Sequence, residues 1–118
     1  MDCIFCRIAQ KEIPAQILYE DEQVVAFHDI HPLAPVHVLV IPRKHIASVT
    51  NLSDDSGDGQ LMGRLIVVAK NIAEKLGTAQ GGYKLLLRVG KDGGQEVAHI
   101  HLHLLGGGPL AEDIRLAK

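Results

Sequence analysis

The sequence predicts a single domain, residues 1–118, that combines helices with β-strands. Residues 99–105 alternate histidine with isoleucine or leucine, which is the two-residue period of a strand. Residues 60–76 repeat apolar side chains at steps of three and four, which is the period of a helix. A chain of 118 residues is long enough to bury one apolar core without disulfide bonds.

The first elements along the chain are a short helix and three strands. Apolar residues at helical spacing predict a helix within residues 3–14, which ends in proline. Residues 17–20 are expected to form a strand, residues 21–22 a turn and residues 24–30 a second strand. Residues 36–41 are an apolar, β-branched run bounded by prolines, and we expect a third strand there.

The second half of the chain begins with the long helix, expected over residues 60–76 and stopped by Gly77. The acidic stretch 51–59 precedes it, and helix N-termini favour negative charge. Apolar residues extend beyond one stripe of this helix, so we expect it to contact a second surface besides a sheet. Residues 83–89 predict a strand that pairs with the histidine strand, and the run Leu85–Leu87 predicts burial on both its faces.

The histidine strand is expected to carry the chemistry of the domain. Alternation places the imidazoles of His99, His101 and His103 on one face and three aliphatic side chains on the other. The aliphatic face suits a core, whereas a row of imidazoles replaces the packing residues that strands favour and indicates a ligand site. Glycines 106–108 follow and allow close approach of the backbone to a ligand. The pattern alone leaves open histidines on a solvated strand face.

Composition and charge narrow the class of protein. A formal net charge of −2 gives no basic field for a polynucleotide, so we expect no nucleic-acid partner. The chain has no apolar run long enough to span a membrane and no secretory signal, and we expect a cytoplasmic protein. Its two cysteines, Cys3 and Cys6, have the C-x-x-C spacing of a metal or redox pair rather than of a structural disulfide.

The sequence resembles the histidine triad (HIT) family, and within it the Hint branch of nucleotide-binding proteins. Residues 99–105 match the family pattern of His, apolar, His, apolar, His, apolar, apolar. Other similar segments follow in the same order along nearly the whole chain: Cys3–Phe5, Lys11–Pro14, Ala26–Ile30, Ala34–His37, Val40–Pro42 with Lys44–His45, Gly93–Gln95 and Gly106–Gly107. Such a collinear set is more specific than the triad alone.

The resemblance implies an α+β fold in which a five-stranded antiparallel sheet carries one long and one short helix. It also implies a homodimer that joins the two sheets across the long helix and the strand near Leu85. The activity it implies is hydrolysis of purine nucleoside 5′-phosphoramidates to the nucleoside monophosphate through a covalent nucleotidyl-histidine. Two alternatives remain open at this point: a nucleotide-binding regulatory module with little turnover, and a hydrolase of dinucleoside polyphosphates.

The resemblance assigns roles to individual residues. His101 corresponds to the nucleophile that attacks phosphorus, His103 to the residue that binds a phosphate oxygen and assists proton transfer, and His37 to a residue that orients the row. Asp29 corresponds to the carboxylate that binds the ribose hydroxyls. The walls around the base correspond to five apolar residues: Ile4, Phe5, Ile8, Phe27 and Ile30.

Residues before the histidine strand are expected to position phosphate. Gln95 and Glu96 lead into the strand, and their backbone amides and side chains are candidates. Glu96 stands where many relatives have serine, and a carboxylate cannot donate to a phosphate oxygen, so its backbone N–H is the expected contact. Arg88 stands where relatives have asparagine, and this longer cation could bind phosphate or point away.

A structural zinc ion is the cofactor that we expect. Two thiolates, those of Cys3 and Cys6, need two further ligands for a closed tetrahedral site. In zinc-bearing members of the resembled family these ligands are the histidine after the Ile-Pro motif and the first histidine of the triad, here His45 and His99. The alternative is a reduced cysteine pair without metal.

Overall fold

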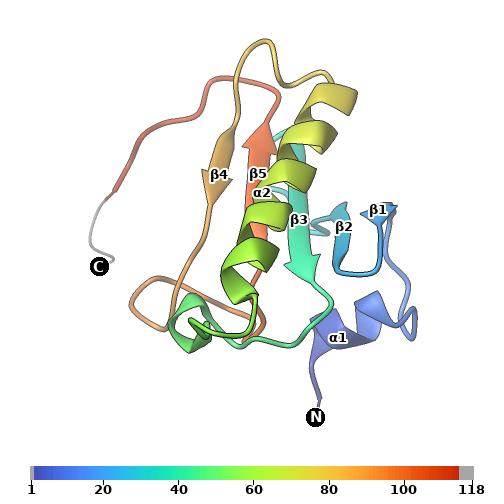
Figure 1. Ribbon diagram of the computed structural model, residues 1–118. Coiled ribbons are helices and arrows are strands. Elements are labelled where there is room, and N and C mark those ends of the chain that lie inside the picture. Colours follow the sequence, from blue (N-terminus) through green and yellow to red (C-terminus); the bar gives the residue numbers. More distant parts are fainter. Residues whose placement is uncertain (1, 115–118) are drawn as a thin grey trace.

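The computed structural model describes residues 2–114 and has the expected α+β architecture (Figure 1). A five-stranded antiparallel sheet has the strand order β1-β2-β3-β5-β4. The elements are α1 (Ile4–Ala9), β1 (Ile17–Glu20), β2 (Val24–His28), β3 (Val36–Pro42), a 3-10 turn η1 (Val49–Asn51), α2 (Asp58–Lys75), β4 (Lys84–Leu86) and β5 (Leu102–Gly106). Within residues 2–114, no helix combines the length and apolar character needed to cross a bilayer.

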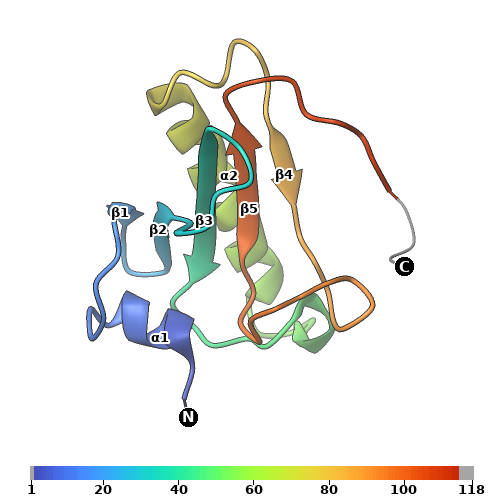
Figure 2. The ribbon, with the colours of Figure 1, turned by 180° about the vertical axis from the view of Figure 1, so that it is seen from behind.

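Two apolar layers lie on opposite faces of the sheet. The long helix α2 covers one face, in front of the sheet in Figure 1 and behind it in Figure 2. The core beneath α2 includes Val24, Ala26, Val38, Val40, Ile100, Leu102 and Leu104, which pack against Leu65, Val68, Ala69 and Ile72 of the helix. The second layer joins the short helix α1 to the other side of the strands through Phe5, Ile8, Val25, Phe27, Leu39 and Ile41.

The register of β3 against β5 decides which side chains face each layer. Val38 lies opposite Leu104, and Leu39 lies opposite His103. Directly opposed residues share a face, so the aliphatic pair packs under α2 while His103 faces the α1 side. The expectation that the aliphatic residues of the histidine segment line a core is therefore confirmed.

The short helix ends earlier than the sequence predicts. It stops at Ala9 because Lys11 adopts a left-handed conformation, with φ of 62°, and the Glu12 N–H bonds to the Arg7 carbonyl at 2.8 Å. This C-terminal cap reverses the chain before Pro14 is reached. The strand expected over residues 24–30 also stops early, at His28.

The ladder of the histidine strand is displaced toward its C-terminal end. It begins at Leu102 and extends to Gly106, so that His99 and His101 lie before β5, with His99 in a bend. Gly107 follows with φ of 93°, and a Cβ there would lie 2.8 Å from the Cβ of Pro35. The close approach that requires glycine is thus to the β2–β3 loop of the same chain.

The prediction that the strand now labelled β4 is buried on both faces is wrong for the single chain. β4 pairs only with β5 and forms an edge of the sheet. Leu85 and Leu87 keep 36% and 38% of their surface exposed. A run of three leucines does not distinguish a strand buried within one chain from one that presents an apolar edge.

The long helix begins at Asp58, two residues before its predicted start. The Asp58 carboxylate is buried in the first turn, where it accepts from Lys44 Nζ and from the Ser53 N–H, both at 2.8 Å. Lys44 and these hydrogen bonds lower the pKa of Asp58 to about 2. The expected acidic N-terminus is therefore present, and it also connects the helix to the segment that follows β3.

Candidate active site

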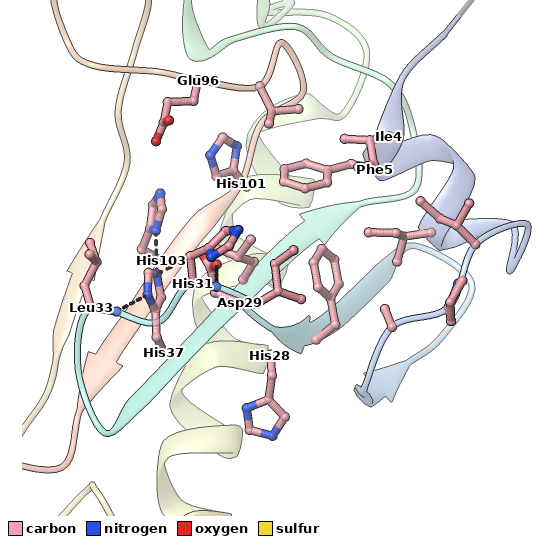
Figure 3. Close-up of a pocket in the computed structure, with 18 of the residues that line it drawn as sticks. Ile4, Phe5, His28, Asp29, His31, Leu33, His37, Glu96, His101 and His103 are labelled. Carbon is pink, nitrogen blue, oxygen red and sulfur yellow. Dashed lines mark hydrogen bonds and ion pairs between the residues drawn. The ribbon is translucent and has the colours of Figure 1, made fainter.

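A cavity of about 730 Å³ lies between α1, the β2–β3 loop and the histidine segment (Figure 3). This volume is in the range typical of small-molecule sites. Ten of the predicted catalytic and nucleotide-binding residues line it together: Ile4, Phe5, Ile8, Phe27, Asp29, Ile30, His37, Glu96, His101 and His103. The structure therefore brings together residues that are far apart in the sequence.

The apolar wall of the cavity depends on Phe5. Its ring meets Phe27 of β2 edge to face, with the centroids 5.6 Å apart, and meets His101 in the same way at 5.0 Å. These T-shaped contacts are the favoured geometry for aromatic pairs. One phenyl ring thus joins the apolar end of the cavity to the first imidazole of its polar end, as the two labelled side chains show in Figure 3.

A chain of hydrogen bonds assigns the tautomers of His37 and His103. The Leu33 N–H can only donate, and it bonds to His37 Nδ1 at 3.0 Å. Neutral His37 therefore carries its proton on Nε2, which lies 2.9 Å from His103 Nδ1. His103 accepts there, so its own proton is on Nε2. That atom is buried and has no hydrogen-bond partner in the structure.

His101 is held in the opposite tautomer. Its Nδ1 lies 2.7 Å from the backbone carbonyl of His99, which can only accept, so Nδ1 carries the proton. The Nε2 atom of neutral His101 then has a free lone pair. The ring centroids of His101 and His103 are 4.9 Å apart. The cavity therefore presents an imidazole lone pair and an imidazole N–H side by side.

Burial keeps the imidazoles of His37, His101 and His103 neutral. Removal from water lowers the pKa of His37 and of His101 below the ordinary value. For His103, burial and then the charges of His101, Arg88 and His37 lower the pKa to about 4. At neutral pH all three rings are uncharged, which is the state that the tautomer assignment requires.

Asp29 lies where β2 leaves the sheet. One carboxylate oxygen accepts from the His31 N–H at 2.8 Å, and this local turn directs the chain away from the ladder. The other oxygen lies 3.4 Å from His37 Nε2. Asp29, His37 and His103 are close enough together to hold a cation, but the facing nitrogens of the two histidines already form a donor–acceptor pair.

Gln95 is the one predicted nucleotide-binding residue that does not line the cavity. Its Nε2 donates to the carbonyls of Ala47 and Val97, at 2.7 and 2.9 Å, and its Oε1 accepts from the Gly90 N–H at 2.9 Å. The side chain thus braces the β4–β5 loop. The backbone carbonyl of His99 and the N–H of Leu33, which set the tautomers, have no side-chain signature and could not be found from the sequence.

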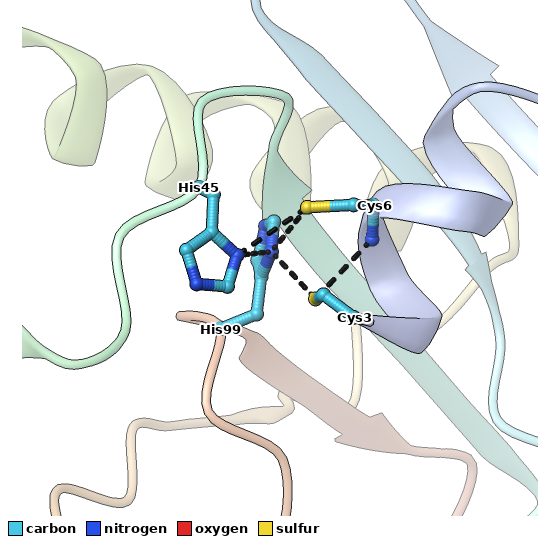
Figure 4. Close-up of side chains that lie close together, drawn as sticks. All are labelled: Cys3, Cys6, His45 and His99. Carbon is cyan, nitrogen blue, oxygen red and sulfur yellow. Dashed lines mark hydrogen bonds between the residues drawn. The ribbon is translucent and has the colours of Figure 1, made fainter. Parts of the chain in front are cut away.

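The first histidine of the row belongs to a second cluster (Figure 4). His99 Nδ1 lies 3.4 Å from Cys3 Sγ, 3.6 Å from Cys6 Sγ and 3.1 Å from His45 Nδ1. Cys6 Sγ is 3.3 Å from His45 Nδ1. The Nε2 atom of His99 donates to the Pro42 carbonyl at 2.8 Å, so its Nδ1 has a lone pair that faces the cluster. These four side chains could hold a metal ion.

The family model of the HIT domain matches residues 10–110 of the chain. Purine nucleoside phosphoramidase from Escherichia coli (strain K12) is 49% identical over 109 residues, which cover 92% of this chain and 90% of that protein.

Solved structures agree with the sequence comparison. A HIT family hydrolase from Legionella pneumophila Philadelphia 1 superposes with a TM-score of 0.90 at 48% identity, over 94% of this chain and 97% of that one. A histidine triad protein from Clostridium difficile superposes with a TM-score of 0.92 at 43% identity, over 97% of both chains. The family model, the sequence identity and the superpositions agree with one another, and this chain belongs to the HIT domain family.

Proposed function

We propose that the protein hydrolyses the phosphorus–nitrogen bond of purine nucleoside 5′-phosphoramidates, releasing the nucleoside monophosphate and an amine. The observation that carries this proposal is the pair of opposite tautomers in the cavity, a free Nε2 lone pair on His101 beside a free Nε2–H on His103. A nucleophile and a hydrogen-bond donor are the groups that substitution at phosphorus needs. The name of the Escherichia coli relative supports the choice of substrate.

His101 is the nucleophile in this mechanism. A bond forms between Nε2 and phosphorus as the phosphorus–nitrogen bond breaks, and the leaving nitrogen keeps its electron pair and takes up a proton from solvent. The carbonyl of His99 accepts from Nδ1 and stabilises the positive charge that develops on the ring. Water then attacks phosphorus, the electron pair of the bond to Nε2 returns to His101, and a proton is released.

His103 and His37 act on the phosphate group. The unpartnered Nε2–H of His103 donates to a phosphate oxygen and assists the transfer of the proton to the leaving nitrogen. His37 orients His103 through the hydrogen bond between Nε2 and Nδ1. Because the Leu33 N–H donates to His37 in turn, a backbone group sets the direction of both hydrogen bonds in this series.

The nucleoside occupies the other end of the cavity. Asp29 accepts from the ribose hydroxyls with the lone pairs that the His31 N–H leaves free. The base lies against the apolar wall formed by Ile4, Phe5, Ile8, Phe27 and Ile30. Glu96 lines the rim near His101, where its backbone N–H is available to phosphate.

The second cluster is proposed to hold a structural zinc ion. Tetrahedral zinc, with bonds of about 2.0–2.1 Å to nitrogen and about 2.3 Å to sulfur, separates two nitrogens by about 3.3 Å and a nitrogen from a sulfur by about 3.5 Å. The nitrogen–nitrogen distance is 3.1 Å and the three nitrogen–sulfur distances are 3.3, 3.4 and 3.6 Å. The ion would link α1 to the segments that carry His45 and His99.

A homodimer is the proposed assembly. α2 exposes Ile66 and Val67, with 49% and 45% of their surfaces accessible, and the edge at β4 exposes Leu85 and Leu87. Apolar surface of this kind on a helix and an adjacent sheet edge indicates an interface, and a two-fold contact would cover both copies of it.

Loss of the nucleophile should abolish turnover and keep binding. We expect His101→Asn to lower kcat/KM by about three orders of magnitude or more. AMP affinity, measured by calorimetry, should change little, because asparagine leaves the apolar wall and Asp29 intact. Rapid quenching of the unaltered enzyme should trap an acid-labile nucleotidyl adduct. Near-normal activity of His101→Asn together with an inactive His103→Gln would instead favour attack by water.

The pH dependence should follow the lowered histidine pKa values. Attack needs the lone pair of His101, which is lost as the pH falls through the pKa of the folded protein. Because burial lowers that pKa, the acid limb of kcat/KM should lie below the ordinary value of 6.5, with a plateau at neutral pH. An acid limb at or above 6.5 would contradict the assignment.

Metal removal should weaken both the fold and the nucleotide site. Protein purified without a tag should contain about one zinc per chain. Chelation should lower Tm and weaken AMP binding, because the two cysteines flank Ile4 and Phe5 of the apolar wall. His45→Ala should reproduce the metal loss, and His31→Ala, outside the cluster, should retain the ion. Far less than one zinc per chain, or an unchanged Tm after chelation, would refute the site.

The assembly can be tested by sedimentation at micromolar concentration. The chain should sediment as one species of twice its 12.8 kDa mass. Ile66→Glu should shift it toward the monomer by burying a charge at the interface. Ile30→Glu is the matched control, since Ile30 is 82% exposed at the rim of the cavity. A monomer of the unaltered chain would exclude the dimer.

A further inference from the structure

Arg88 differs from the other arginines in having no ion-pair partner among residues 2–114. Four arginines lie within residues 2–114, and three of them form ion pairs: Arg7 with Asp2 and Glu12, Arg43 with Glu20, and Arg64 with Asp21. Arg88 makes no ion pair or hydrogen bond with that part of the chain, although it is half-buried and lines the cavity with His101 and His103. A half-buried guanidinium with five free donors is a site for an anion.

The order of the strands places Arg88 at one end of the site. The apolar wall comes from α1 and β2, Asp29 follows β2, and the two reacting histidines belong to the β5 segment. Arg88 comes two residues after β4, the strand beyond β5 in the order β1-β2-β3-β5-β4 (Figure 2). With the base on the wall and phosphorus at His101, a substituent on the far side of phosphorus extends toward β4 and Arg88.

Two carboxylates line the cavity with Arg88, and neither forms an ion pair with it. The side chain of Glu96 is exposed, so water screens its carboxylate. Asp29 accepts from the His31 N–H and lies 3.4 Å from His37 Nε2.

We propose that Arg88 binds a carboxylate on the leaving amine, so that the preferred substrates are nucleoside phosphoramidates of amino acid-like amines. This inference rests on the proposed function, because it names the group released from phosphorus. Guanidinium and carboxylate match as a bidentate, charge-assisted pair, and asparagine at this position would offer only a neutral amide. Arg88 is thus a specificity-determining residue for the leaving group.

The test uses two substrates that differ only in this charge. Adenosine 5′-phosphoramidates of β-alanine and of β-alaninamide have nearly the same shape, but only the first carries a carboxylate. Arg88→Gln should lower the ratio of their kcat/KM values by about tenfold or more, as expected for a lost hydrogen bond to a charged group. Arg88→Lys should keep part of the ratio. Lys91→Gln, which removes an exposed cation from the same loop, should keep all of it.

Binding separates this inference from the proposed hydrolysis. Calorimetry measures the affinity for each of the two phosphoramidates in the absence of turnover. It is carried out with His101→Asn and with the double variant that adds Arg88→Gln, and the ratio of the two affinities is compared between the variants. A preference for the carboxylate that disappears in the double variant supports the inference even if the unaltered protein cleaves neither compound, in which case the hydrolase proposal alone fails. An equal loss of affinity for both compounds would indicate that Arg88 binds the phosphate itself. No loss of affinity for either compound would indicate that Arg88 is a solvated cation. Either result would overturn the inference.

Discussion

The pairing of β3 with β5 is the constraint on which the rest of the structure depends. Its register sets Val38 opposite Leu104 under α2, and Leu39 opposite His103 on the cavity side. A shift of one residue would exchange the faces of every side chain, burying imidazoles against the long helix and opening the core to the cavity. The same ladder brings His37 to within hydrogen-bond distance of His103, across 66 residues of sequence. Core and chemistry are therefore specified by one set of backbone bonds.

Periodicity predicts the faces of the strands but not the partners of the side chains. Alternation correctly separates the aliphatic residues of the β5 segment from its histidines, and the family motif brings nearly all the nucleotide residues to one cavity. Alternation does not show that His99 turns to the cysteines, which only the family resemblance predicts, because the Pro42 carbonyl that orients its ring is distant in sequence. Nor does alternation show that the Gln95 side chain points away from the cavity, since its partners are backbone groups of three separate residues. Such hydrogen bonds depend on the path of the loops, and loop sequences have no periodic pattern from which that path could be predicted.

Backbone groups, rather than charged side chains, fix the tautomers of His37 and His101 in the cavity. The carbonyl of His99 and the N–H of Leu33 each have a single hydrogen-bonding role, so they assign a tautomer without adding charge. Desolvation also favours the neutral rings by lowering their pKa values. Each unit by which a pKa falls is worth about 1.4 kcal/mol in favour of the neutral ring. For His103, whose pKa is about 4, this preference is large compared with the worth of a typical hydrogen bond. The arrangement keeps one ring able to give electrons and its neighbour able to give a hydrogen bond.

The six-residue length of α1 has a consequence for how a ligand leaves the cavity. A helix of this length is not stable by itself in water, since isolated helices need roughly 12–15 residues even to be marginal. Its order comes from the contacts of Phe5 and from the cysteines at its first turn. The sheet, by contrast, is held by continuous ladders and by α2. We therefore expect α1, which supplies Ile4, Phe5 and Ile8 to the wall, to open locally, with its amides exchanging with solvent while those of β3 and β5 stay protected. Opening of α1 would widen the cavity for a departing nucleotide while the β3–β5 ladder keeps His37 and His103 in place.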